Sequence, residues 1–231
     1  MIAIIDYGMG NLFSLSSSLK SLGQDVKVTG DPEDLRKADR LFLPGVGAFE
    51  DASKRLYGTG LAQVIKEEAA AGKPLMGICL GMQLLFDRSF EYGEWEGLGL
   101  VPGDVVPMEG YVDSSLKIPQ IGWNALHFTG KECPVFQDTK EGDYVYFVHS
   151  YYASKCEDHT IATTEYSKEL TAAVANGNVI GCQFHPEKSG EIGLKILKIF
   201  CQMEAQSCYC FPPLTSSVEK RSAFCAATTT K

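Results

Sequence analysis

Short apolar runs alternate with helical patterns over the first part of the chain. Runs of four or five apolar residues between turn residues are typical of strands buried on both faces of a sheet. Such runs occur at residues 2–5, 40–44 and 75–78, and residues 25–28 alternate like a further strand. Apolar residues three and four apart predict the intervening helices, at residues 11–22, from Asp31, at 49–72 with a break at 58–60, and at 80–86. This alternation predicts an α/β fold with a mainly parallel central sheet and helices on both faces.

After about residue 95 the pattern changes to short strand-like runs separated by turn residues. These runs lie at residues 121–126, 144–148, 160–163 and 179–184. We expect them to extend the sheet or to add an antiparallel edge to it. A last amphipathic helix is predicted at 191–203, because its apolar residues recur on one face: Ile192, Ile196, Ile199, Phe200 and Met203.

The end of the chain differs in composition from the rest. Two consecutive prolines and a cluster of Ser and Thr predict a flexible tail at 205–231, beyond a single domain at 1–204. The whole chain has 21 basic and 29 acidic residues, so its net charge of −8 disfavours binding to nucleic acid. No apolar run approaches the ~18 residues that a membrane span needs, and no basic leader precedes residues 2–5. We therefore expect a cytoplasmic protein that binds no membrane.

The eight cysteines do not form a recognisable metal-binding or disulfide pattern. No pair has Cys-x-x-Cys spacing, and the Cys-x-Cys of Cys208 and Cys210 has no second pair nearby. We expect neither a metal nor a cofactor.

One cysteine lies in a context that suggests catalysis. Gly77-Ile78-Cys79-Leu80-Gly81 places Cys79 between two glycines, where an apolar strand passes into a helix. A nucleophile at such a sharp turn is held exposed in strained backbone geometry, and a helix N-terminus favours its thiolate. The alternative is a buried structural cysteine, which is the commoner role for a single cysteine.

Two further segments follow apolar strands. His185-Pro-Glu187 supplies a base and a carboxylate that would orient it, as a cysteine nucleophile requires. Pro44-Gly45-Val46-Gly47 has two glycines whose backbone N–H groups are free to point outward, as an oxyanion hole requires. Alone, the first would be read as an exposed loop and the second as an ordinary Pro-Gly turn. Together the three segments occupy three successive strand ends and fill three different catalytic roles.

In this order the three segments resemble the triad-type (class I) glutamine amidotransferases. The resemblance implies that Cys79 is the nucleophile, His185 the general base and acid, and Glu187 its orienting carboxylate. It also implies a γ-glutamyl thioester, released by water as glutamate, after ammonia has left. The backbone at Gly47 and the N–H of Leu80 would form the oxyanion hole. Two more residues would contact the glutamine: Gly45 and Gln83.

Four longer segments narrow the resemblance to the glutaminase subunits of imidazole glycerol phosphate synthases: residues 1–12, 44–49, 120–124 and 146–152. The resemblance implies a heterodimer with a (β/α)₈-barrel cyclase subunit, which uses the ammonia to make imidazole glycerol phosphate and an aminoimidazole carboxamide ribotide. It places three residues at the partner interface: Asn11, Trp123 and Tyr146. It places three others around the L-glutamine: His149, Ser150 and Tyr151. From the residues alone, core is the commoner role for such aromatic residues, and His149 is more often a structural histidine than a second base.

Other functions remain open from the sequence. The chain could be the glutaminase subunit of a different biosynthetic synthase, a cysteine peptidase or hydrolase on a similar sheet, or a binding module that has lost activity. Because the chain has no acceptor domain of its own, we expect it to be nearly inactive alone, with the backbone at Val46–Gly47 misaligned until a partner docks.

Overall fold

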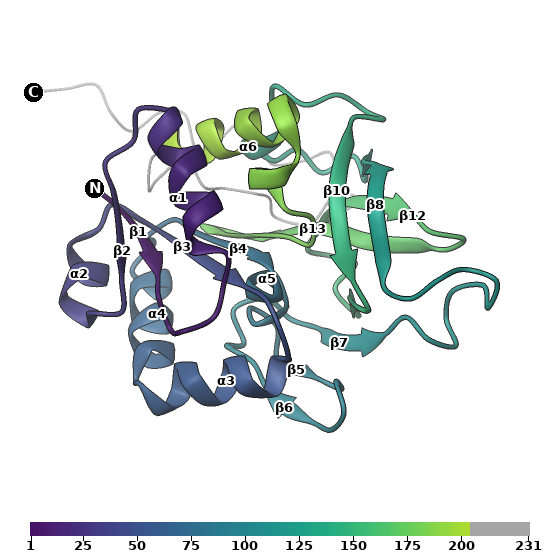
Figure 1. Ribbon diagram of the computed structural model, residues 1–231, viewed down its shortest axis with the longest axis horizontal. Coiled ribbons are helices and arrows are strands. Elements are labelled where there is room, and N and C mark those ends of the chain that lie inside the picture. The colour runs from purple at the N-terminus through teal and green to yellow at the C-terminus, as the bar shows by residue number, and fades with distance from the viewer. Residues whose placement is uncertain (204–231) are drawn as a thin grey trace, which may run out of the picture.

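The computed structural model describes residues 1–203, and the tail predicted at 205–231 lies outside the described residues. An eight-stranded sheet runs through the middle of the molecule (Figure 1). Its strands, in spatial order, are β2 (Val26–Thr29), β1 (Ile2–Ile5), β3 (Arg40–Gly45), β4 (Leu75–Cys79), β14 (Val179–Cys182), β13 (Glu169–Asn176), β12 (Thr160–Glu165) and β9 (His127–Phe128). The first five are parallel and the last three join antiparallel, which confirms the mainly parallel α/β fold.

The central strands are buried on both faces, which is why their sequences are continuously apolar. All four residues of β1 are buried. Ile2 and Ile4 pack in the apolar cluster on one face of the sheet, and Ala3 and Ile5 pack in the cluster on the other. This alternation follows from the two-residue repeat of a strand.

Helices cover both faces, as the sequence predicts, and Figure 1 shows the sheet between them. One face is covered by α1 (Leu12–Ser21) and α6 (Gly190–Gln202), most of whose buried apolar residues belong to the first cluster. The other is covered by α2 (Pro32–Lys37), α3 (Phe49–Gly58) and α4 (Leu61–Ala70). The break expected at 58–60 is confirmed, because Gly60 adopts a left-handed conformation between α3 and α4.

The helix predicted at 80–86 is wrong in length: α5 (Leu80–Gln83) makes only one turn. The carbonyls of Leu84 and Leu85 accept hydrogen bonds from the backbone N–H groups of Leu98 and Leu100, respectively. The carbonyl of Phe86 accepts one from the N–H of Gly99. A returning segment thus takes the backbone partners that a longer helix would use. The apolar spacing in this stretch reflects burial in the core rather than continued helix.

Two small sheets complete the described part of the chain. The segments expected at 121–126 and 144–148 do not join the central sheet, since β8 (Gln120–Ala125) and β10 (Tyr144–His149) pair only with each other. A four-stranded sheet that the sequence did not predict contains β11 (Tyr151–Ser154), β7 (Asp104–Pro107), β5 (Arg88–Ser89) and β6 (Trp95–Glu96). Single 3₁₀ turns form at η1 (Pro134–Phe136) and η2 (Pro186–Lys188). Within residues 1–203, no helix is both long and apolar enough to cross a membrane.

Candidate active site

Cys79 lies at a sharp turn between β4 and α5. Its φ of 55° falls in the left-handed region that non-glycine residues rarely adopt, and such strain is typical of functional positions. The two flanking glycines are required by close packing. A Cβ on Gly81 would lie 1.8 Å from the carbonyl oxygen of Leu43, and one on Gly77 would lie 2.6 Å from that of Gly81. The strand–turn–helix geometry predicted for Cys79 is therefore present.

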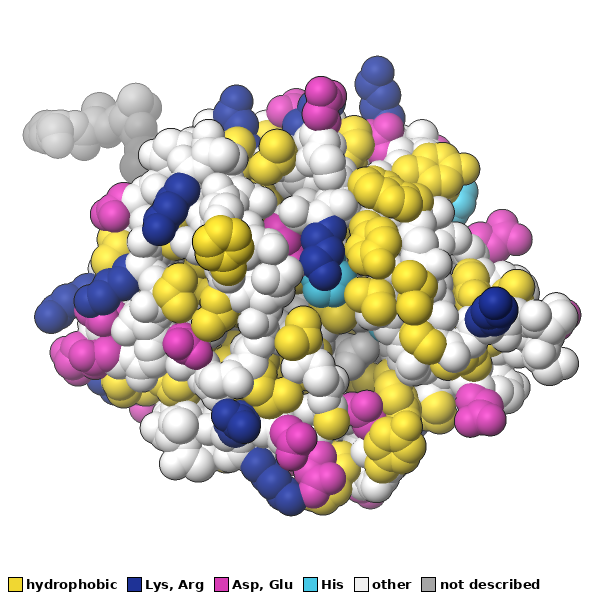
Figure 2. All heavy atoms as spheres, viewed as in Figure 1, with side chains coloured by type: hydrophobic (Ala, Val, Ile, Leu, Met, Phe, Trp, Pro, Cys, Tyr) yellow, Lys and Arg dark blue, Asp and Glu magenta, His cyan; other side chains and the backbone are white. Residues whose placement is uncertain are grey.

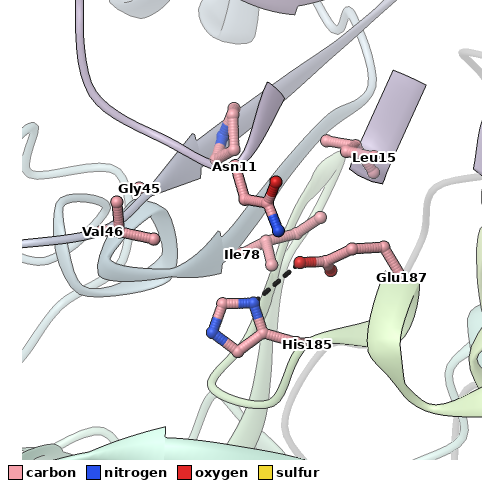
Figure 3. A pocket seen from close by; sticks show the side chains of 8 residues that line it. Asn11, Leu15, Gly45, Val46, Ile78, His185 and Glu187 are labelled. Atoms are coloured by element: carbon pink, nitrogen blue, oxygen red, sulfur yellow. Dashed lines mark hydrogen bonds and ion pairs between the residues drawn. The ribbon is translucent and has the colours of Figure 1, made fainter. Parts of the chain in front are cut away.

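His185 and Glu187 lie at the end of the neighbouring strand, β14. The Nδ1 atom of His185 is 2.8 Å from Oε1 of Glu187, and both side chains are only 3% exposed. The reading of this segment as an exposed loop is therefore wrong. Figure 3 shows the Glu187 carboxylate directed at the His185 ring. Because Nδ1 faces Glu187, the other ring nitrogen is left for Cys79.

The electrostatic environment makes His185 a strong base. Burial alone would lower the pKa of His185, but its hydrogen bonds to Cys79 and Glu187, and the negative charge of both groups, outweigh burial and raise it to about 9. Protonated His185 is thus stabilised between a sulfur and a carboxylate. This arrangement favours transfer of the Cys79 proton to the imidazole, which is how a cysteine nucleophile is activated.

The predicted oxyanion segment lies on the other side of Cys79. The three strand ends are adjacent, because β3, β4 and β14 are neighbours in the sheet, and Gly45 is paired with Cys79 in register. A Cβ on Gly45 would lie 2.8 Å from the Tyr7 hydroxyl, which donates a hydrogen bond to the carbonyl of Pro44. Gly47 has a φ of 99°, so the chain turns there in a conformation suited to glycine.

A cavity of about 370 Å³ opens beside Cys79. Six of the residues predicted for the oxyanion hole and the glutamine pocket line it: Gly47, Leu80, Gln83, His149, Ser150 and Tyr151. Gly45 does not; it lines a smaller hollow behind His185 and Glu187, together with Asn11 (Figure 3). The Asn11 side chain caps α1 by accepting a hydrogen bond from the Ser14 N–H.

Two polar side chains of the cavity are fixed by one backbone carbonyl. The carbonyl oxygen of Tyr151 is 2.8 Å from Nδ1 of His149 and accepts a hydrogen bond of 3.1 Å from Nε2 of Gln83. Burial, only partly opposed by the bond to Tyr151, lowers the pKa of His149 to about 4, with the charge of His185 acting in the same direction. His149 is therefore neutral near pH 7 and is a much weaker base than His185.

The cavity residues that were not predicted from the sequence include three with ionisable side chains: Glu91, Tyr92 and Lys188. The carboxylate of Glu91 accepts a hydrogen bond of 2.6 Å from the Phe49 N–H, and burial raises its pKa. Tyr92 is 88% exposed at the rim and has a φ of 50°. The first two lie in the turn between β5 and β6, two strands of only two residues each. Of these residues, only Lys188 could have been found from the sequence, because it directly follows Glu187.

The outer face of β8 and β10 carries exposed aromatic side chains. Trp123 is 52% exposed, so its interpretation as a core residue is wrong. The centres of the Trp123 and Tyr146 rings are 6.0 Å apart. The Lys188 ammonium lies 5.9 Å from the Tyr146 ring centre, which connects this face to the cavity. Figure 2 shows apolar side chains gathered over β8 and β10. Within residues 1–203, no cluster of three His, Cys, Asp or Glu side chains is placed to hold a metal ion.

Comparison with known proteins identifies the class that this fold and site define. Residues 3–202 match the family described as glutamine amidotransferase class-I, and the chain belongs to that family. Among curated relatives, it is 52% identical over 204 residues to the imidazole glycerol phosphate synthase subunit HisH of Caldanaerobacter subterraneus subsp. tengcongensis, covering 88% of this chain and 98% of the relative. It is 50% identical to the HisH subunit of Sulfurimonas denitrificans, covering 87% of this chain and 97% of that subunit.

Solved structures with the same fold are more distant in sequence. One described as a glutamine amidotransferase has a TM-score of 0.67 at 20% identity and covers 87% of this chain and 98% of its own. A chain of PurLQS from Thermotoga maritima has a TM-score of 0.66 at 23% identity, with coverage of 87% and 97%. At this level of identity the likeness shows the fold alone.

Proposed function

We propose that this chain is the glutaminase subunit of an imidazole glycerol phosphate synthase. It hydrolyses glutamine to glutamate and ammonia and supplies the ammonia to a cyclase subunit in histidine biosynthesis. The observation that carries the proposal is the identity of about 50% to HisH subunits over nearly their whole length. A cytoplasmic location stays a prediction that accords with such a biosynthetic role.

The mechanism begins with proton transfer from the Cys79 thiol to His185. The thiolate attacks the side-chain carbonyl carbon of glutamine, and the resulting oxyanion is held by the N–H of Leu80 and the backbone at Gly47. His185 returns its proton to the departing nitrogen, so ammonia leaves and a thioester to Cys79 remains. His185 then takes a proton from water, which attacks the thioester and releases glutamate. Glu187 keeps the imidazole oriented throughout.

The other residues of the cavity bind the end of the glutamine substrate that carries its α-ammonium and α-carboxylate groups. The polar groups of Gln83, His149, Ser150 and Tyr151 border the space where the substrate chain must lie, and the carboxylate of Glu91 is placed to receive its α-ammonium group. Gly45 acts indirectly, by leaving room for the elbow backbone beside Tyr7. These roles need no cofactor.

The cyclase contacts Trp123 and Tyr146 on the outer face of β8 and β10, and Asn11 at the start of α1. A few residues supply most of the binding energy in a protein interface, and Trp and Tyr are enriched among them. Lys188 reaches from this face to the cavity, so a docked partner contacts a residue that follows the triad directly. Docking at this position couples glutamine hydrolysis to the presence of the ammonia acceptor, and the chain alone is nearly inactive.

The test measures glutaminase activity of the wild type and of Cys79→Ala, each with and without a cyclase subunit and its nucleotide substrate. We expect turnover only in the wild-type complex, and a loss of at least about 10³-fold in Cys79→Ala. Rapid hydrolysis by the wild type alone, unaffected by the cyclase, would contradict the histidine-pathway assignment. Full activity of Cys79→Ala would contradict the nucleophile, and cleavage of peptides instead of glutamine would favour a different hydrolase.

A further inference from the structure

Two buried glutamine side chains connect the wall of the cavity to the sulfur of Cys79. Nε2 of Gln83 donates to the carbonyl of Tyr151 at 3.1 Å and to Oε1 of Gln183 at 3.0 Å. Nε2 of Gln183 in turn lies 3.8 Å from Sγ of Cys79. Gln183 is fully buried, and it directly follows β14, one register step beyond the pair formed by Cys182 and Ile78. The catalytic mechanism above assigns Gln183 no role.

The direction of these hydrogen bonds is determined from one end. A backbone carbonyl only accepts hydrogen bonds, so Gln83 must present its NH₂ group to Tyr151. The second hydrogen of that NH₂ group points to Gln183, whose facing atom must therefore be the amide oxygen. The remaining group of Gln183, its own NH₂, is left facing the sulfur of Cys79. The amide orientation of Gln183 is thus specified by the backbone at Tyr151.

We propose that Gln183 is a positioning residue that donates an N–H hydrogen bond to the Cys79 thiolate and holds the sulfur in place for attack. This role rests on the proposed function, in which Cys79 is the nucleophile. A hydrogen bond to an ion is stronger than one between neutral groups, so the donor favours the thiolate over the thiol. Gln83 acts through Gln183, and it also lines the cavity, so the same side chain borders both the substrate and the donor.

The other groups around the sulfur explain why such a donor is needed. The carbonyl oxygen of Val148 lies 3.8 Å from Sγ and suits a thiol, which donates to it, but repels a thiolate. The helix that follows Cys79 has only four residues, too few for a large helix dipole. Two ionisable groups interact electrostatically with Cys79: His185 and Tyr7. Five others share its cavity: His149, Glu91, Tyr92, Tyr151 and Lys188.

The test is the rate at which iodoacetamide alkylates Cys79, followed by mass spectrometry of its peptide from acid to alkaline pH. Gln183→Met keeps the length of the side chain and removes the donor. We expect the midpoint of the pH profile to rise by about one unit, equivalent to about tenfold less thiolate below the midpoint. We also expect kcat to fall by about tenfold or more while KM changes little, because Gln183 does not line the cavity. Gln63→Met, on an exposed position of α4, is the matched control and leaves both unchanged.

A second variant keeps the test decisive if Gln183→Met does not fold. Gln83→Met removes the N–H that orients Gln183, and we expect a smaller rise of the same midpoint together with a higher KM. An unchanged midpoint in the folded variants, with Cys79→Ala inactive, would overturn the role of Gln183 and leave the proposed function intact. Full activity of Cys79→Ala would instead overturn the proposed function itself.

Discussion

The electrostatic interactions of Cys79 and Glu187 both act on the imidazole ring of His185. Its pKa is raised to about 9 although it is buried, because Cys79 and Glu187 both favour its charged form. A histidine whose pKa is higher in the folded than in the unfolded state, where it is about 6.5, stabilises the fold fully below pH ~6.5. This contribution is lost as the pH rises from about 6.5 to about 9.

The residue-scale prediction is that Glu187→Gln lowers the pKa of His185. Removing the charge leaves burial less opposed, so the unfolding free energy of the variant should fall relative to wild type at pH 6 and converge toward it at about pH 9 and above. Glutaminase activity of the complex should fall by about 10³–10⁴-fold. The pH dependence of the imidazole NMR signals measures the pKa directly. Because the chain has only four histidines, the signal of His185 can be assigned. A His185 pKa unchanged in the variant would contradict this account.

The control for that experiment is His127, which forms a comparable contact outside the site. Nδ1 of His127 is 2.7 Å from Oε1 of Glu141, but both side chains are about half exposed. Solvent screens such a pair, so Glu141→Gln should change the unfolding free energy far less than Glu187→Gln does and leave activity unchanged.

At the scale of secondary-structure elements, the turn from β4 into α5 depends on glycine at one point above all. Gly81→Ala would place a Cβ 1.8 Å from the carbonyl oxygen of Leu43, in backbone that cannot move aside without disturbing β3. We expect a loss of about 3 kcal/mol or more in unfolding free energy, measured by denaturant titration. Gly58→Ala, where a Cβ would meet no atom within 4 Å, is the matched control and should change stability by no more than about 1 kcal/mol. Equal stability of the two variants would contradict the packing argument.

The secondary-structure elements also determine which parts of the fold and of the candidate site could be predicted from the sequence. Cys79, His185 and Glu187 lie in short motifs directly after apolar strands, and parallel strands bring such ends together, so the proximity of these three residues could be predicted without coordinates. Glu91 and Tyr92 could not, because the two-residue strands that return them to the cavity have no periodicity to detect. The separate pairing of β8 and β10 could not be predicted from the sequence either. Their apolar alternation specifies a half-buried strand but not which sheet it joins.

At the scale of the whole molecule, the aromatic face of β8 and β10 is free to bind a partner. Its exposed side chains include Ile121, Trp123 and Tyr144. Removing an exposed aromatic ring costs the folded chain little but removes contact area from a complex.

The corresponding prediction concerns Trp123→Ala. We expect the dissociation constant of the complex with the cyclase to rise about 30-fold, equivalent to about 2 kcal/mol, while the unfolding free energy of the isolated chain changes by less than about 0.5 kcal/mol. Titration calorimetry measures the first quantity and thermal unfolding the second. Tyr57→Ala, an exposed aromatic on α3, should leave the affinity unchanged. Equal affinity of wild type and Trp123→Ala would place the interface elsewhere.

The position of β14 between β4 and β13 has a consequence for synthesis on the ribosome. β4 is complete at Cys79, but its neighbour begins only at Val179, so the growing chain carries an unpaired edge while the intervening residues are made. Such an edge is a site for pairing with other chains, and chaperones are expected to cover it. His185 and Glu187 directly follow the same late strand. The proposed mechanism needs both residues, so a nascent or prematurely ended chain that has Cys79 but not β14 lacks the means to activate the thiol.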